Sequence, residues 1–225
     1  STKRYYNDED RLENTFMLTG LMRVASHTKL LSEFDFGMID YDTGVNSNSK
    51  MYQLLAGVER LPRADEPGLD LKLRVGYRWQ EYQRNTDKNF DGYAAYIDMK
   101  EAFNEYDELG LHLTESIQES TYADNNYYVF DSVSADYNHR LRSNIKFSLG
   151  ASGFYQHSRY PKESTESGIT ARRRDHFYGA GLKINYDIQK WLTASVGYNY
   201  RKRSSNMNSL DYDDSNVTAS IKARY

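Results

Sequence analysis

The chain has 225 residues, of which 39% are hydrophobic and 27% charged, with a net charge of −3 and no cysteine. This charge does not indicate a general nucleic-acid-binding protein. The lack of cysteine excludes a disulfide scaffold and a thiolate metal site. A mean hydropathy of −0.84 is that of a very soluble chain, yet 21 Tyr, 9 Phe and 2 Trp are too many for a solvated coil. This composition fits strands that are apolar on one face and polar on the other.

Apolar and polar residues alternate with a period of two along most of the chain, most clearly over 69–80, 144–156 and 192–201. No segment shows a helical repeat, and no run of 18 apolar residues predicts a transmembrane helix. Consecutive long strands imply an antiparallel meander, because parallel strands need crossover connections. The eleven expected strands are centred on 14–24, 28–39, 50–60, 69–82, 92–101, 108–118, 126–138, 143–157, 173–187, 191–202 and 214–225.

The connections between these strands alternate in length. Those on one side are tight turns at 25–27, 139–142 and 188–190 and somewhat longer connections at 61–68 and 102–107. Those on the other side are long and rich in Asn, Asp, Ser, Thr and Gly, and lie at 40–49, 84–92, 120–126, 159–172 and 203–214. This pattern predicts an all-β fold, an antiparallel up-and-down transmembrane β-barrel that crosses the outer membrane of a Gram-negative bacterium many times.

The placement of aromatic residues favours a membrane barrel over the alternative, a soluble up-and-down barrel with its apolar face inward. On the apolar parity, aromatic side chains stand at both strand ends with aliphatic residues between them, and Tyr suits a lipid–water boundary. The membrane-interface aromatics expected at the loop end are Tyr52, Tyr77, Trp79, Tyr93, Tyr127, Tyr155, Tyr178, Tyr198 and Tyr200. Those expected at the turn end are Tyr137, Tyr186 and Tyr225.

The opposite parity carries charges of both signs, which cannot crowd a dry core unless they are paired but can face a wet lumen. The lumen-lining charged residues that we expect are Lys72, Arg74, Arg78, Lys146, Lys183, Arg201, Lys222, Arg224, Glu33, Asp35 and Asp98. Rings of Lys and Arg favour anionic solutes in pores. The alternative is that these cations pair with acids on neighbouring strands and stiffen the wall.

The last ten residues alternate strictly, and their apolar members Ile221, Ala223 and Tyr225 resemble the C-terminal insertion signal of bacterial outer-membrane proteins. That resemblance implies the barrel-insertion machinery as a partner, together with outer-membrane lipid. Eleven strands is an odd number, whereas bacterial single-chain barrels have even numbers. We therefore expect residues 1–225 to form one outer-membrane β-barrel domain that lacks at least one N-terminal strand, unless "TKRYYN" (2–7) is a twelfth. Since no signal-peptide pattern opens residues 1–225, we expect the signal of an exported protein to have been removed or to lie outside them.

The sequence gives little indication of catalysis. His112 and Ser116 share a strand face about 13 Å apart, too far for a nucleophile–base pair. Asp211, Asp213 and Asp214 could bind a divalent ion, although a solvated acidic loop is the simpler interpretation. No Gly-rich phosphate loop or metal-spaced His cluster is present. We therefore expect no enzymatic activity, no metal and no cofactor.

Short motifs at loop–strand junctions within 170–225 carry a resemblance. They are Arg174 and Asp175 followed by Tyr178, "YNYRKRSSN" (198–206) and "DYDDSN" (211–216), with a weaker copy in Arg11 and Glu13. In these motifs the chain resembles a family of bacterial outer-membrane β-barrel porins that is associated with exopolysaccharide gene clusters. The resemblance implies a conduit or assembly partner for exopolysaccharide export or solute passage, contacting an anionic polysaccharide or a periplasmic export partner. The alternatives are a plugged, anchoring barrel that binds a partner through its loops, and an outer-membrane hydrolase.

Overall fold

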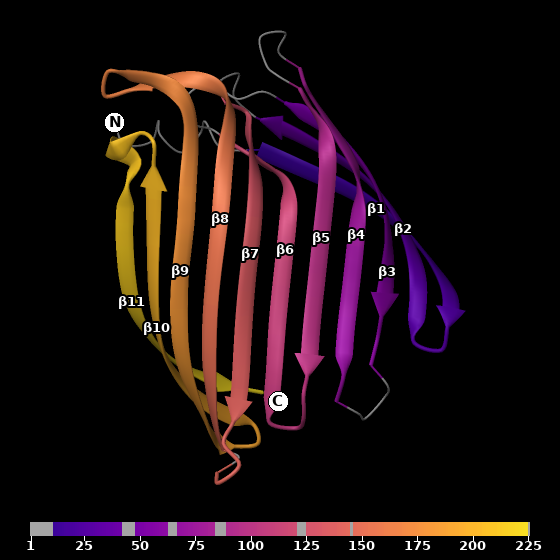
Figure 1. The fold of residues 1–225 in the computed structure, drawn as a ribbon, viewed down its shortest axis with the longest axis vertical. Helices are drawn as coiled ribbons and strands as arrows, with labels where there is room; N and C mark the ends of the chain where they lie inside the picture. The colour runs from indigo at the N-terminus through magenta and orange to yellow at the C-terminus, as the bar shows by residue number, and fades with distance from the viewer. Residues whose placement is uncertain are drawn as a thin grey trace.

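The computed structural model describes residues 11–41, 48–62, 67–83, 89–120, 125–144 and 146–224. In this part of the chain, eleven antiparallel strands form one sheet in which every strand pairs with the next in sequence, which confirms the predicted meander (Figure 1). The strands are β1 (Arg11–Ala25), β2 (Thr28–Tyr41), β3 (Ser49–Arg60), β4 (Leu69–Tyr82), β5 (Phe90–Ala102), β6 (Asp107–Glu119), β7 (Tyr127–Arg140), β8 (Phe147–Glu166), β9 (Ile169–Gln189), β10 (Leu192–Ser205) and β11 (Tyr212–Ala223).

The sheet is a curved wall, and a 3₁₀ turn, η1 (Asn208–Leu210), precedes β11 (Figure 1). Strand order runs from β1 to β11 without interruption, and within the described residues these two edge strands are not paired with each other. The same part of the chain contains no helix long and apolar enough to cross a bilayer. The predicted twelfth strand, "TKRYYN", lies outside the described residues.

One predicted loop is wrong. Residues 159–172 do not form an irregular loop, because β8 continues to Glu166 and β9 already begins at Ile169. Ser167 and Gly168 both have positive φ, 50° and 81°, which is the backbone that a two-residue hairpin turn requires. The pairing shifts between Arg159 and Glu163, so that Pro161 falls in a bulge, where a residue without an N–H is tolerated. The polar composition of 159–172 reflects an exposed hairpin.

The polarity of the sheet is the reverse of that in a soluble protein. On the concave face, polar side chains such as Glu33 and Gln80 are only 3% and 1% exposed. On the convex face, aliphatic side chains stand free, with Leu182, Val217 and Ile221 65%, 73% and 74% exposed. A soluble barrel would bury this aliphatic set, so the arrangement fits a wall with hydrocarbon outside.

Most of the predicted interface aromatics lie on the convex face. At the loop end, Tyr77 contacts both Trp79 and Tyr93, with ring centroids 4.8 and 5.5 Å apart. On β9, Tyr178 and Tyr186 stand at opposite ends of the apolar stretch, roughly 26 Å apart along a strand that rises ~3.3 Å per residue. On a strand tilted by about 35–45°, this length covers roughly 20 Å of the membrane normal, the same order as the apolar band of about 25 Å in outer-membrane barrels. The other members of the convex set are Tyr52, Tyr155, Tyr198 and Tyr200 at the loop end and Tyr137 at the turn end.

Replacing Leu182 by Arg tests which face of the sheet contacts lipid. Leu182 lies midway between Tyr178 and Tyr186, so Leu182→Arg should lower the free energy of unfolding in lipid vesicles by about 2–4 kcal/mol, as Arg does at the bilayer midplane. The matched variant Ser220→Arg, on the concave parity, should change it by less than about 1 kcal/mol. Urea titration monitored by tryptophan fluorescence measures both values. Equal losses in the two variants would contradict the assignment of faces.

Candidate functional site: the concave face

A chain of ion pairs and histidine–carboxylate contacts crosses the concave face from β2 to β7. Glu33 Oε1 lies 3.4 Å from Nη1 of Arg74, and Nη2 of Arg74 lies 3.2 Å from Asp98. Asp98 in turn contacts Nδ1 of His112 at 3.0 Å, and Nε2 of His112 lies 3.7 Å from Asp136. The carboxylates compensate the charge of Arg74, the arrangement we considered as the alternative to a free cationic ring.

A second set of hydrogen bonds lies beside these ion pairs. Gln53 donates to the buried carboxylate of Asp35 at 2.7 Å, and Tyr96 donates to Gln53 at 3.1 Å. The Tyr96 hydroxyl also lies 3.0 Å from that of Ser116. Ser116 is thus engaged by Tyr96, whereas His112 contacts carboxylates. These bonds leave the two residues with different partners and give no support to a hydrolase.

The remaining predicted lumen charges divide into two groups. Among those in the N-terminal half, Arg78 donates to Gln80 at 2.7 Å, and Lys72 borders a hollow of about 290 Å³ with Glu59, Asp98 and His112. In the C-terminal half, the exposed guanidinium of Arg201 pairs with Asp214 at 2.7 Å. Exposed residues there also include Lys183, Lys222, Arg224 and Lys146. Lys146 is not within the strand as expected but lies in the turn before β8, because β8 begins at Phe147.

The concave face of β7–β11 is hollowed. Two adjoining hollows of about 460 and 410 Å³ share Asp136, Ser152, Gly181 and Asn199. Small residues create this space. A Cβ at position 181 would stand 2.5 Å from Oδ1 of Asn199 and 2.9 Å from Oγ of Ser152, so glycine lets these two polar groups approach each other. We call the two hollows together the polar track.

The loop end of β6 and β7 leaves the sheet and bends toward its concave side. Pairing between β5 and β6 ends at Ala95 and Glu115, whereas β6 and β7 stay paired up to Glu119 and Tyr127. Figure 1 shows the upper ends of β5 and β6 diverging. Tyr127, expected at the lipid interface, is therefore wrongly placed by the sequence. It is 6% exposed and stacks on Tyr82 of the concave face, with ring centroids 5.9 Å apart.

Glu119 holds this in-folded tip, which we define as residues 116–119 and 127–130. Its Oε1 accepts hydrogen bonds from Ser49 at 3.1 Å, from Tyr82 at 3.2 Å, and from Gln80. Residues 116–119 lie beyond the last pair of β5 and β6, outside the membrane-spanning part of the wall. Burial raises the pKa of Glu119, opposed by the hydrogen bonds to its carboxylate. No sequence period could reveal Glu119, because its donors come from β3 and β4.

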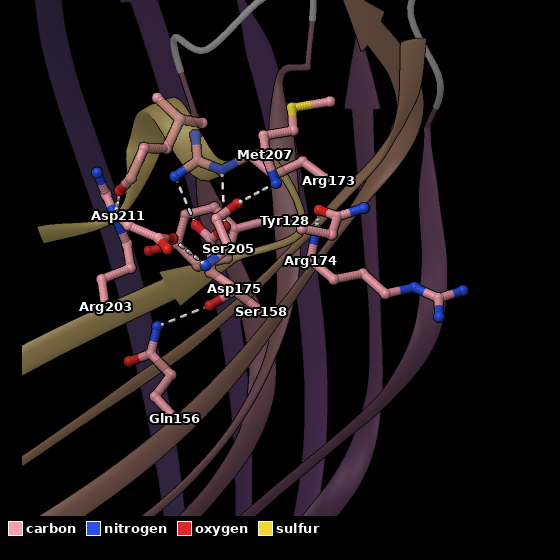
Figure 2. Close-up of polar contacts among 12 residues, drawn as sticks. Tyr128, Gln156, Ser158, Arg173, Arg174, Asp175, Arg203, Ser205, Met207 and Asp211 are labelled. Carbon is pink, nitrogen blue, oxygen red and sulfur yellow. Dashed lines mark hydrogen bonds and ion pairs between the residues drawn. The ribbon is translucent and has the colours of Figure 1, made fainter. Parts of the chain in front are cut away.

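The resemblance motifs meet at the loop end of β9 and β10 (Figure 2). The acid Asp175 pairs with Arg173, two residues away and on the same face, with Nε of Arg173 3.0 Å from Oδ1. The guanidinium of Arg173 lies over the Tyr160 ring at 4.6 Å. Arg174, which the sequence pattern singled out, points away from this cluster (Figure 2).

The N-terminal copy of the motif has the same construction. Arg11 pairs with Glu13 at 2.5 Å and lies over the Tyr41 ring at 5.7 Å. The shared arrangement is therefore an Arg, an acid two residues later, and a Tyr from the preceding or following strand. It joins strands and needs no ligand to satisfy its charges.

Asn206 joins the loop end of β10 to the loop end of β9. Its Oδ1 accepts from the backbone N–H of Arg174 at 2.8 Å, and its Nδ2 donates to the carbonyl of Arg172 at 3.0 Å. Asp211 accepts from the N–H of Ser205 at 2.6 Å. These side chains replace backbone pairing where β10 ends. No group of three or more His, Cys, Asp or Glu in the described residues is arranged to hold a metal ion.

Ile221 and Ala223 of the expected insertion signal lie exposed on β11, on its convex parity. Tyr225, their third member and also an expected turn-end aromatic, lies outside the described residues.

A family model and one solved structure agree with this architecture. A family model described as "Putative beta-barrel porin 2" matches residues 4–225. The FrpB iron transporter of Neisseria meningitidis (F3-3 variant) superposes with a TM-score of 0.65 at 11% identity, over 96% of this chain but only 40% of its own. OmpT of Vibrio cholerae (loop L8 deletion mutant) gives 0.43 at 9% identity, over 94% and 97% of the two chains. The NanC porin gives 0.41 at 9%, over 96% of each. No curated protein matches significantly.

Removing the Glu119 carboxylate should release the in-folded tip. Glu119→Ala leaves three donors without their acceptor, at a cost of about 1–3 kcal/mol, so amide protection factors at residues 116–119 and 127–130 should fall roughly 5- to 150-fold. Hydrogen exchange followed by mass spectrometry measures them, and Glu115→Ala, an exposed Glu on the same strand, is the matched control. Unchanged protection in Glu119→Ala would show that Glu119 does not hold the tip.

The raised pKa of Glu119 gives that tip a pH dependence. A carboxyl whose pKa is higher in the folded than in the unfolded state binds protons more readily when folded, so the fold gains stability as pH falls through that interval. After division by intrinsic exchange rates, protection of the tip should therefore rise between pH 7 and pH 4. Glu119→Gln, which is always neutral and keeps an acceptor oxygen, should abolish this rise. A rise of equal size in Glu119→Gln would assign it to another group.

Proposed function

Because the chain belongs to the beta-barrel porin 2 family and is a multi-strand β-barrel protein of the bacterial outer membrane, we propose that its concave face lines a passage for hydrophilic solutes. The observation that carries this proposal is the polar track, since a wall built only for anchoring would have no need of a hollow lined by Ser, Asn and Gly. The chain spans only 40% of the FrpB structure. What we say below of the solute and partners of the whole barrel is therefore also part of this proposal.

The chemistry of the polar track favours a polyhydroxylated solute. Ser152 and Asn199 present hydroxyl and amide groups at its centre, where the two hollows meet. Lys183 borders one hollow and Arg201 the other. Exchangeable hydrogen bonds suit a sugar polymer. The exposed Lys183 at one end offers a cation to negative charge on that polymer, whereas Arg201 at the other end is already paired with Asp214. An anionic exopolysaccharide is therefore the cargo that we propose, in keeping with the resemblance of the loop–strand motifs.

Two further contacts belong to this proposal. We assign outer-membrane lipid to the convex aromatics and the barrel-insertion machinery to the strand that holds Ile221 and Ala223. A periplasmic export partner would meet the turn end of the wall. Each of these assignments comes from the sequence pattern and applies to the whole barrel of which the described strands form the wall.

A plugged, anchoring barrel is the second candidate, and the in-folded tip favours it. Tyr127 and Ile117 of the tip pack with Tyr82 of the wall, which narrows the passage from the loop side. In that case the loops would bind a partner, and the concave charges would serve only to stiffen the wall. Reconstitution of the whole barrel distinguishes the two, because a plugged barrel passes no current.

A bulky side chain in the polar track tests the proposal. In planar bilayers, the whole barrel with Ser152→Trp should show single-channel conductance reduced by about half or more, because Ser152 borders both hollows and an indole there would fill part of each. Ser32→Trp, on the convex parity of β2, is the matched control and should conduct like the wild type. Block of the wild-type current by an anionic oligosaccharide should weaken in Lys183→Gln. A wild-type barrel without current would reject the conduit in favour of the plugged barrel.

A further inference from the structure

The convex face carries a basic pair that the passage does not use. Arg159 of β8 and Arg174 of β9 are direct cross-strand partners, and both are exposed. Like charges directly opposite each other on a sheet face are destabilising. Figure 2 shows the Arg174 guanidinium turned away from the Arg173–Asp175 cluster. The two arginines therefore face outward together.

Aromatic and acidic side chains lie next to this pair. His157 and His176 form the neighbouring cross-strand pair on the convex face, two residues closer to the membrane, and their rings stack with centroids 4.8 Å apart. Nδ1 of His176 lies 2.8 Å from the Tyr155 hydroxyl. Asp131 lies 2.9 Å from Arg159 and 3.8 Å from His157. Glu115, the cross-strand partner of Asp131 on β6, adds a second carboxylate beside the two guanidinium groups. Asp131 engages Arg159, whereas Arg174 forms no ion pair with a carboxylate of the described residues and so keeps its positive charge available.

The height of the pair on the wall points to its ligand. Tyr155 and Tyr178 are cross-strand partners in the loop-end row of aromatics, and Arg159 and Arg174 lie four residues further toward the loops. Since Tyr marks the boundary of hydrocarbon and headgroups, the arginines stand at the level of the headgroups of the outer leaflet. An anion available there is a phosphate ester on a lipid.

An apolar groove adjoins the basic pair on the same face. It has a volume of about 350 Å³, and its lining includes Ile97, Leu113, Val133 and Tyr155. Asp131, the partner of Arg159, also borders it. The groove lies where β5 and β6 separate, next to the small side chain of Ala95. Side chains that can bind a charged headgroup and a groove that can hold an acyl chain thus lie next to each other on the convex face.

We propose that Arg159 and Arg174, together with this groove, form a binding site for a phosphorylated glycolipid of the outer leaflet, the lipid A part of lipopolysaccharide. The two guanidinium groups bind a lipid phosphate through charge-assisted hydrogen bonds, and an acyl chain lies along Ile97 and Val133. The site depends on the outer-membrane location of the barrel and is independent of whether the concave face conducts.

Native mass spectrometry of the whole barrel in detergent, titrated with purified lipid A, tests the proposal. Loss of two surface cations should weaken lipid A binding roughly tenfold or more in Arg159→Gln/Arg174→Gln. The double lysine variant Arg159→Lys/Arg174→Lys keeps the charge and should retain most of the binding. Arg60→Gln/Arg140→Gln, two exposed arginines at the turn end, gives the same change in net charge and should bind like the wild type. Heat-modified electrophoretic mobility reports folding of every variant.

Two further arms separate the lipid from free phosphate. Dephosphorylated lipid A should bind about as weakly to the wild type as lipid A binds to the double glutamine variant. Inorganic phosphate at millimolar concentration should not compete with lipid A. Should the glutamine and turn-end variants weaken binding equally, or should free phosphate displace the lipid, the proposed site would be overturned. If the glutamine variant failed to fold, equal affinity of the wild type for both forms of lipid A would overturn it.

Discussion

In hydrocarbon every backbone N–H and C=O must find its hydrogen-bond partner within the protein, and this constraint dictates the rest of the molecule. It requires strands whose edges are paired, and here each of the eleven described strands pairs with its neighbours in sequence. It also allows aliphatic side chains to face outward, because lipid accepts them. The same constraint applies to the outer edges of β1 and β11, so in a membrane each edge must pair with another strand.

With lipid outside, the concave face becomes the polar face, and it is not uniform. Over β2–β7, carboxylates compensate the charge of Arg74, and His112 continues the chain of polar contacts to Asp136. Over β7–β11, small side chains leave open space around Gly181. The ion pairs stiffen the first region, whereas the open space gives the second the character of a channel wall. The in-folded tip lies at the loop end of the first region, held there by Glu119.

Sequence reasoning succeeds where the relevant period is local. The eleven strands, the meander and the two faces follow from alternation, which is a property of neighbouring residues. Sequence reasoning fails where residues of a distant strand determine the position of a side chain. Tyr127 obeys the outward parity of β7, yet the tip bends inward, because Tyr82 and Glu119 offer it partners. Likewise Asp175 pairs with Arg173 rather than with the adjacent Arg174, since side chains alternate across a strand.

The hairpin at the loop end of β8 and β9 has a practical consequence for locating the protein in the cell. Its two-residue turn, Ser167–Gly168, is exposed, and a side chain added at Gly168 would meet no atom within 4 Å. An epitope tag inserted there would leave the β8–β9 ladder undisturbed. Antibody staining of intact cells would then report directly which end of the wall faces the exterior.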